Sequence, residues 1–124
     1  AAVEANITKA FPDVAVMPTA DLETIEQSGQ SVILFDARSE EEFAVSRIKG
    51  ARRVEPGMSV TQFQNEFGAD LKGRKIVVYC AVGQRSSVLA SRIKNVAKQA
   101  GADGVYSLQG GIFRWHNERR PLVG

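Results

Sequence analysis

The sequence predicts an α/β fold built on a mostly parallel sheet. Continuous apolar runs at residues 14–17, 32–35 and 76–79 are separated by segments with apolar residues at helical spacing. Such runs are typical of strands that are buried on both faces. Strands that alternate with helices favour a parallel sheet with helices on both faces. Residues 50–54 and 105–108 supply the remaining two of five expected strands.

Length and composition fit one globular domain. The chain has 124 residues, of which 44% are hydrophobic and 24% are charged, and its net charge is +2. This charge does not indicate a nucleic-acid binder, and it fits a local basic site for a small anion. We expect one domain over residues 13–124, preceded by a flexible N-terminal segment at residues 1–12. The sequence leaves the oligomeric state open.

The sequence contains no candidate membrane span. No apolar run approaches the roughly 18 residues that a membrane helix needs. We therefore expect a soluble protein, either cytoplasmic or periplasmic, and the compartment stays open. The first residue is Ala1 and not Met. Either a processed N-terminus or a cloning choice explains this start.

Two helix starts carry the same sequence pattern. Ser39 precedes Glu42 by three residues, and Ser59 precedes Gln62 by the same interval. In a capping box of this kind, the two side chains bond each other's backbone N–H groups. The neighbouring acidic residues 40–42 complement the helix dipole, so we expect them to be solvated and not catalytic.

The most informative segment is the loop that follows the strand at 75–79. The strand leads directly to Cys80, and a helix over about 86–100 follows the loop. Backbone N–H groups of such a loop, together with the helix dipole, form an anion site. These donors and a nearby guanidinium also favour a reactive thiolate. We predict Cys80 as the catalytic nucleophile, with a substrate-binding loop of Ala81, Val82, Gly83, Gln84, Arg85 and Ser86.

The chain resembles the rhodanese family from about Val14 to its end. Four motifs appear in the family's order, and together they are stronger evidence for the resemblance than any one motif alone. Residues 80–85 resemble the six-residue active-site loop. The other three motifs are Asp36-Ala37-Arg38 with Glu42-Phe43, Ile48-Lys49-Gly50-Ala51, and Leu108-Gln109-Gly110-Gly111 with Trp115.

The resemblance implies a single rhodanese-like domain that transfers sulfur in two steps. Cys80 would take a sulfane sulfur from thiosulfate or a similar small anionic donor and hold it as a persulfide. An external thiol, cyanide or protein acceptor would then remove it, because the chain has no second cysteine. Nothing implies a cofactor. The single histidine, His116, excludes a zinc cluster of the usual His/Cys kind.

The other motif residues have structural interpretations. Asp36 and Arg38 are expected to hold the strand end and the following helix together. Phe43, Phe113 and Trp115 are expected in the core or in the pocket wall.

Basic residues outside the loop have open interpretations. Arg47 replaces the histidine that relatives often carry before the Ile-x-Gly-Ala segment. In relatives this position looks structural, although the replacement could change the charge near the pocket. Arg114, Arg119 and Arg120 form either a solvated face or a rim that attracts an anionic donor.

Two rival functions remain at this point. Cysteine-based phosphatases have a similar loop, but they keep five residues between Cys and Arg, whereas four intervene here. The shorter loop suits a transferable sulfur better than a phosphoryl group. Rhodanese-like domains also serve as non-enzymatic binding or regulatory modules, usually when the loop cysteine is lost. The presence of Cys80 favours an enzyme.

Overall fold

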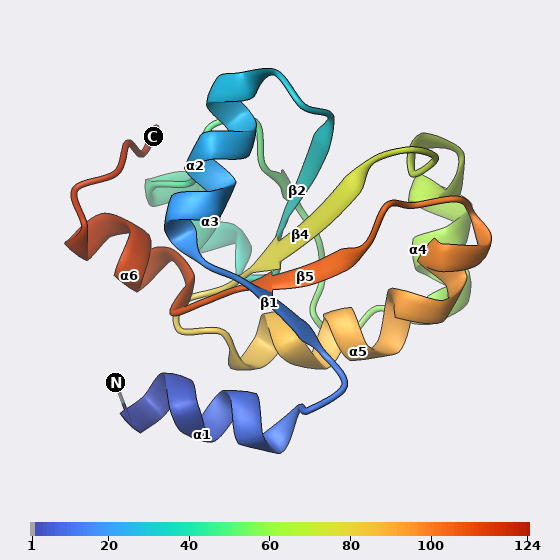
Figure 1. Cartoon of the computed structure of the whole chain (residues 1–124), viewed down its shortest axis with the longest axis horizontal. Coiled ribbons are helices and arrows are strands. Elements are labelled where there is room, and N and C mark those ends of the chain that lie inside the picture. The colour runs from blue at the N-terminus through green and yellow to red at the C-terminus, as the bar shows by residue number, and fades with distance from the viewer. Residues whose placement is uncertain (1) are drawn as a thin grey trace.

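The computed structural model describes residues 2–124, and its centre is a five-stranded sheet (Figure 1). The strands stand in the order β1-β5-β4-β2-β3, and every neighbouring pair is parallel. The predicted α/β fold is therefore confirmed, and the strand that leads to Cys80 is the central one. The strands are β1 (Ala15–Met17), β2 (Val32–Asp36), β3 (Arg52–Arg53), β4 (Lys75–Tyr79) and β5 (Val105–Leu108).

Helices cover both faces of the sheet, with α2 and α5 on opposite sides in Figure 1. Side chains alternate along each strand, so that Ile76 and Val78 pack toward α4 and α5, whereas Val77 and Tyr79 pack toward α2 and α6. The helices are α1 (Ala2–Ala10), α2 (Thr19–Ser28), α3 (Glu40–Val45), α4 (Val60–Phe67), α5 (Gln84–Gln99) and α6 (Gly111–Asn117), and the 3₁₀ turn η1 (Gly68–Asp70) follows α4.

Three phenylalanines form the centre of the α4 side of the core. The rings of Phe35 and Phe67 meet edge to face with centroids 4.7 Å apart, and Phe63 lies 5.4 Å from both. Phe35 and Phe63 are fully buried. Burial of each such side chain contributes about 1.5–3 kcal/mol. This packing fixes α4 against β2.

Both predicted capping boxes are present. The Ser39 hydroxyl accepts the Glu42 N–H and the Glu42 carboxylate accepts the Ser39 N–H, and Ser59 and Gln62 repeat the arrangement. Helix α5 begins at Gln84, two residues before the expected start. The difference arises because the first turn of α5 is itself part of the cysteine loop.

The N-terminal segment contains a helix that the sequence did not predict, α1 at Ala2–Ala10. The flexibility expected for residues 1–12 stays a prediction. Glu4 of α1 forms an ion pair with Arg114 of α6 at 2.6 Å, and Ile7 is half-buried next to the cysteine loop. The ionic partner of Glu4 lies 110 positions away in the chain, so a local pattern does not contain this contact.

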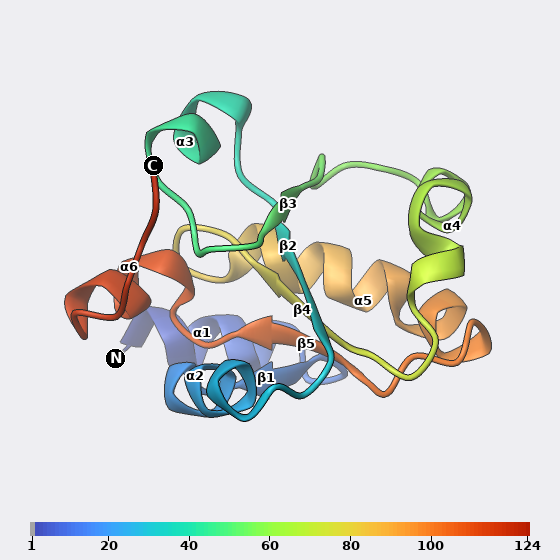
Figure 2. The same ribbon diagram turned by 90° about the horizontal axis from the view of Figure 1, so that it is seen from above.

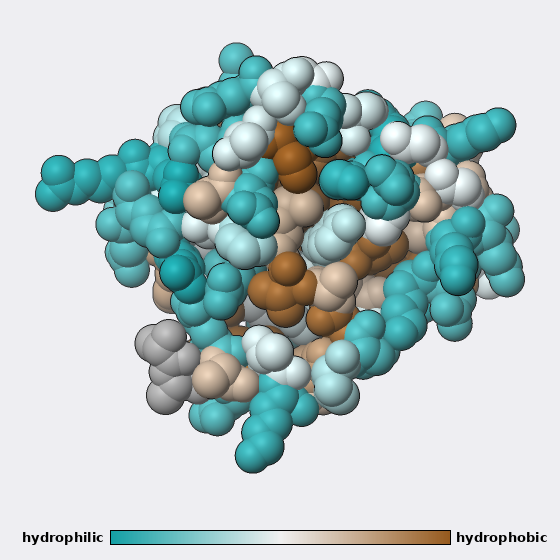
Figure 3. Space-filling view, viewed as in Figure 1, coloured by the Kyte–Doolittle hydropathy of each residue, from teal (hydrophilic) through white to brown (hydrophobic). Residues whose placement is uncertain are grey.

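The C-terminal end lies beside α3, as Figures 1 and 2 both show. Arg47 and Val123 exchange two backbone hydrogen bonds of 2.8 Å, which form an isolated antiparallel bridge. On the face seen in Figure 3, hydrophilic side chains surround a few apolar ones over the region of β1 and β5. Among residues 2–124, the structure has no helix with the length and apolar character that crossing a membrane requires.

Candidate functional site

The candidate site lies at the carboxyl end of β4. Cys80 follows the last residue of that central strand, and the loops after β2 and β5 reach the same edge of the sheet. In parallel sheets this edge is where ligands bind. The Cys80 side chain is only 1% exposed, and a pocket reaches it from outside.

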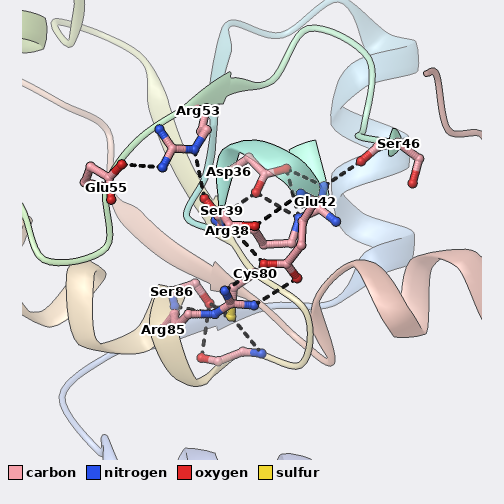
Figure 4. A network of polar contacts seen from close by, with 11 residues as sticks. Asp36, Arg38, Ser39, Glu42, Ser46, Arg53, Glu55, Cys80, Arg85 and Ser86 are labelled. Atoms are coloured by element: carbon pink, nitrogen blue, oxygen red, sulfur yellow. Dashed lines mark hydrogen bonds and ion pairs between the residues drawn. The ribbon is translucent and has the colours of Figure 1, made fainter. Parts of the chain in front are cut away.

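Two backbone N–H groups point at the sulfur. Gly83 N lies 3.2 Å from Cys80 Sγ and Ser86 N lies 3.4 Å from it. Ser86 is the third residue of α5, so the sulfur accepts the bond that a capping side chain normally takes. Gly83 has a φ of +118°, which a side chain would disfavour. The loop therefore stabilises negative charge on the sulfur, as Figure 4 shows for Cys80 and Ser86.

Helix α6 holds the loop in this orientation. Ile112 N donates to the carbonyl oxygen of Cys80 at 2.9 Å, and Phe113 N donates to that of Ala81 at 3.0 Å. These bonds draw the two carbonyl groups toward α6, away from the sulfur. The Gly110-Gly111 turn thus has a direct role in the site, because it allows the start of α6 to contact the loop.

Three buried serines lie behind the sulfur. The Cys80 thiol donates to Ser86 Oγ at 3.5 Å. The hydroxyls of Ser86 and Ser87 both donate to the carbonyl of Gly83, and each also bonds Ser107 of β5. All three serine side chains are therefore satisfied, and they fix the loop against the sheet.

Arg85 forms an ion pair across the mouth of the loop. Its Nη1 lies 3.0 Å from Glu42 Oε1 and its Nη2 lies 3.4 Å from Glu42 Oε2. The hydrogen bond from Arg85, with that from the Ser39 amide, lowers the pKa of Glu42 to about 2. In turn Glu42 raises the pKa of Arg85. Both groups are therefore charged at neutral pH. Glu42, expected to be merely solvated, is the partner of the loop arginine (Figure 4).

Asp36 and Arg38, which were predicted to hold the strand end and the following helix together, form a buried ion pair. Arg38 Nε donates to Asp36 Oδ1 at 3.0 Å, and Nη2 donates to Oδ2 at 2.7 Å. Nη2 also donates to the carbonyl of Ser46, the residue after α3. Because both charged side chains are buried, this pairing fixes the end of β2 to both ends of α3. It thereby sets the place from which Glu42 reaches Arg85.

The pocket at Cys80 has a volume of about 410 Å³. From the loop it is lined by Cys80, Ala81, Val82, Gln84 and Arg85. The remaining lining residues are Val88 and Arg92 of α5, with Pro56 and Gly57 from the opposite side. Within residues 2–124, no cluster of three His, Cys, Asp or Glu side chains is arranged to hold a metal ion.

The structure thus gathers all seven predicted loop residues around one point. Ala81, Val82, Gln84 and Arg85 line the pocket, whereas Gly83 and Ser86 are buried and contact the sulfur through their amides.

The outer aromatic and basic residues are arranged differently from expectation. Trp115 is buried in the core, but Phe113 is 58% exposed and does not line the pocket, because it points away from the inward side of α6. Arg114 pairs with Glu4 and Glu118. None of the arginines at 114, 119 and 120 lines the Cys80 pocket.

Arg47 also stays away from Cys80. Its guanidinium donates to the carbonyl of Phe43 at 3.1 Å and lies 4.8 Å from the centre of the Phe43 ring. Phe43 is half-buried beneath it. Arg47 therefore caps the end of α3 and is absent from the pocket lining.

Sequence reasoning missed four residues that line the pocket, Pro56, Gly57, Val88 and Arg92, and it also missed the ion pair between Glu42 and Arg85. Arg92 could have been found, because Arg85, Val88 and Arg92 follow helical spacing and share one face of α5. Glu42 was interpreted as a capping residue in a solvated acidic run, with no contact to the loop. The turn at residues 56–57 comes from a distant part of the chain, and no local pattern places it opposite Cys80.

Comparison with known families supports the sequence resemblance. A family model described as "Rhodanese-like domain" matches residues 19–118. A Rhodococcus erythropolis tRNA uridine(34) hydroxylase is 35% identical over 98 residues, which cover 75% of this chain and 32% of that protein. A Burkholderia ambifaria protein of the same name is 28% identical and covers 86% of this chain and 40% of its own length. This chain therefore spans about a third of the length of the curated relatives that it matches.

Solved structures share the fold. A Rhodopseudomonas palustris protein described as a possible tyrosine phosphatase has a TM-score of 0.69 at 26% identity, covering 98% of this chain and 93% of that one. The thiosulfate sulfurtransferase from Pseudomonas aeruginosa has a TM-score of 0.76 at 18% identity, covering 98% of this chain and 22% of that one. At this identity the second similarity concerns the fold alone.

Proposed function

The chain belongs to the rhodanese-like domain family, and on that premise we propose that it is a sulfurtransferase whose nucleophile is Cys80. The observation that carries the proposal is the pair of N–H donors, from Gly83 and Ser86, directed at Sγ. Donors in this position stabilise a thiolate before reaction and a charged terminal sulfur after it. One arrangement therefore serves both states of the cysteine.

In the first half-reaction, the Cys80 thiolate attacks the outer sulfur of a sulfane donor. A new S–S bond forms as the donor's bond to that sulfur breaks, and the electron pair leaves with the rest of the donor. With thiosulfate the leaving group is sulfite. The free amides at the start of α5 are the groups available to bind it.

In the second half-reaction, an acceptor attacks the outer sulfur of the Cys80 persulfide and releases the thiolate. Cys80 is the chain's one cysteine, so the acceptor is external: a thiol, cyanide or a protein. The two half-reactions predict ping-pong kinetics. No step requires an oxidant, a reductant or a cofactor.

A second candidate function comes from the curated relatives, which are named tRNA uridine(34) hydroxylases. On this interpretation the domain would act on a tRNA uridine as part of a longer protein. The observation that favours it is the 35% identity over three quarters of this chain. The site itself offers a nucleophilic sulfur and a small pocket, which suit sulfur transfer more directly.

The phosphatase alternative is weaker. Four residues separate Cys80 from Arg85, and Arg85 is held by Glu42 at the mouth of the loop. A phosphoryl group needs several free donors around its oxygens, so a carboxylate at this arginine disfavours it.

Intact-protein mass spectrometry tests the proposal directly. Incubation with thiosulfate should add one sulfur atom to the protein, and later addition of cyanide should remove it and yield thiocyanate. Turnover of a phosphate monoester without sulfur uptake would instead support a phosphatase. Hydroxylation of a tRNA uridine, again without sulfur uptake, would support the second candidate. A tight protein partner and no modification of Cys80 would indicate a binding module.

A further inference from the structure

The positive charge of Arg85, the cation of the cysteine loop, is already paired with the carboxylate of Glu42. Both terminal nitrogens of Arg85 face both carboxylate oxygens of Glu42, at 3.0 and 3.4 Å. Glu42 is held there by its capping bond from the Ser39 amide at 3.1 Å. A dianion such as thiosulfate must therefore compete with a fixed carboxylate for this arginine, and the two negative charges repel each other.

The walls of the Cys80 pocket are largely apolar. Pro56, Val82 and Val88 line it together with the methyl group of Ala81. Its volume of about 410 Å³ lies within the range of pockets that bind small organic molecules. This space and these walls suit a donor with an aliphatic body better than a compact inorganic ion.

A second cation stands farther along the pocket. Arg92 follows Arg85 by seven residues on α5, two helical turns or roughly 10 Å away. Its Nη1 donates to the carbonyls of Pro56 and Met58 at 3.1 and 3.0 Å. These partners are neutral, and no carboxylate pairs with Arg92 among residues 2–124. Its positive charge is thus free to attract an anionic group.

We propose that the donor is an organic persulfide with an aliphatic body and an anionic group at its far end, and that Glu42 selects against thiosulfate. This inference rests on the proposed persulfide chemistry of Cys80. The apolar walls contact the body of the donor, and Arg92 binds its anionic end. Arg92, which lines the pocket, and Glu42, which acts through Arg85, are thus specificity-determining residues.

The transfer step balances without a further reactant. The Cys80 thiolate attacks the outer sulfur of R–S–SH, which keeps its proton. The new Cys80 S–S bond forms as the donor's S–S bond breaks, and the electron pair leaves on the inner sulfur as the thiolate R–S⁻. The leaving group is monoanionic at sulfur, so it does not require the cation that sulfite would need.

The experiment compares three donors: thiosulfate, the persulfide of 6-mercaptohexanoate and the persulfide of 6-mercaptohexanol. The two organic persulfides differ only at the far end, so the pair isolates the effect of the anionic group. The initial rate of sulfur addition to Cys80 is measured for the wild type, Glu42→Gln, Arg92→Gln and Glu41→Gln. Glutamine at 42 can still accept the Ser39 N–H, so this variant removes charge and keeps the cap.

We expect the wild type to use the hexanoate persulfide with a kcat/KM about tenfold above that of the hexanol persulfide. Arg92→Gln should abolish that difference by raising KM for the hexanoate donor. Glu42→Gln should lower KM for thiosulfate about tenfold, a larger change than it causes in KM for the hexanol donor. Glu41→Gln, on the same helix and exposed, should match the wild type.

Equal use of the two persulfides by the wild type, or an unchanged thiosulfate KM in Glu42→Gln, would overturn the inference. Either result would still leave sulfur on Cys80 and the proposed function intact. Failure of all three donors to add sulfur would instead reject the proposed function itself. The two failures are therefore distinguishable in one data set.

Discussion

Gly111 lies directly against the carbonyl oxygen of Cys80. A Cβ atom at position 111 would come within 2.4 Å of the backbone oxygens of both Cys80 and Ala81, and the φ of Gly111 is +59°. This close approach is what lets the amides of α6 hold the cysteine loop. The glycine pair that ends the last sequence motif is therefore a requirement of the site as well as of the turn.

Gly111→Ala should destabilise the protein by about 3 kcal/mol, since it combines a positive φ with a clash against backbone. It should also slow sulfur uptake at Cys80, because the loop carbonyls must move. Gly50→Ala is the matched control: φ is +83° there, but nothing lies within 4 Å of the added methyl group. Urea denaturation should place Gly50→Ala between the wild type and Gly111→Ala. An equal loss of unfolding free energy in both variants would show that the positive φ, and not the clash with backbone, causes the destabilisation.

Cys80→Ser should abolish sulfur uptake and leave the fold intact. The serine hydroxyl can accept the same N–H groups from Gly83 and Ser86 that the sulfur accepts. The change in unfolding free energy should therefore stay below about 1.5 kcal/mol. Mass spectrometry after thiosulfate measures the loss of uptake, and circular dichroism checks the fold. A sulfur atom on the Cys80→Ser protein would reject the nucleophile assignment.

Arg38→Met should be strongly destabilising because it leaves the fully buried Asp36 carboxylate without its cation. Breaking a buried pair in this way costs about 3–5 kcal/mol. Lys75→Met offers a comparison, since Lys75 and Asp103 form an exposed pair at 3.1 Å whose loss should cost less than about 1 kcal/mol. Urea denaturation measures both changes. Similar losses in the two variants would contradict a special role for the buried pair.

Acid stability should depend on Glu42. Its pKa is lowered to about 2 in the folded protein by Arg85 and by the Ser39 amide, whereas an unfolded glutamate titrates near about 4.3. A lowered pKa means that the stabilisation is fully present above the unfolded value and is lost as pH falls toward 2. Glu118, whose pKa is also lowered to about 2, loses its contribution in the same window.

Glu42→Gln should consequently lose less stability than the wild type between pH 5 and 2. Glu41→Gln should follow the wild type, because Glu41 is exposed on the same helix. Thermal melts across this pH range measure the difference. A Glu42→Gln profile parallel to that of the wild type would show that the ion pair with Arg85 adds nothing to stability.

Much of the fold could be predicted because its causes are local. The runs at β2 and β4 are buried on both faces, and the two capping boxes fix where α3 and α4 begin. The cysteine loop was equally visible, since strand, loop and helix are contiguous. By contrast, the ion pair of Arg85 joins residues 43 positions apart, and α1 pairs with a residue 110 positions away. Contacts of this kind depend on how the elements dock, which a local pattern does not contain.

Phe113 illustrates a different source of error. It was placed in the core or pocket wall because it is large and apolar, yet it is 58% exposed. Its neighbour Ile112 and, farther on, Trp115 occupy the inward side of α6. On a helix, successive residues point about 100° apart. Phe113 therefore points away from the buried side that Ile112 occupies, although it is also hydrophobic.

The sulfur of Cys80 also completes the first turn of α5, a helix of 16 residues. Any chemical change at that sulfur therefore alters the hydrogen bonding of the first turn of α5. Alkylation would remove the negative charge to which the Gly83 and Ser86 amides donate. The rate at which those two amide hydrogens exchange with deuterium would then report whether the Cys80 sulfur is modified, with no label attached to the protein.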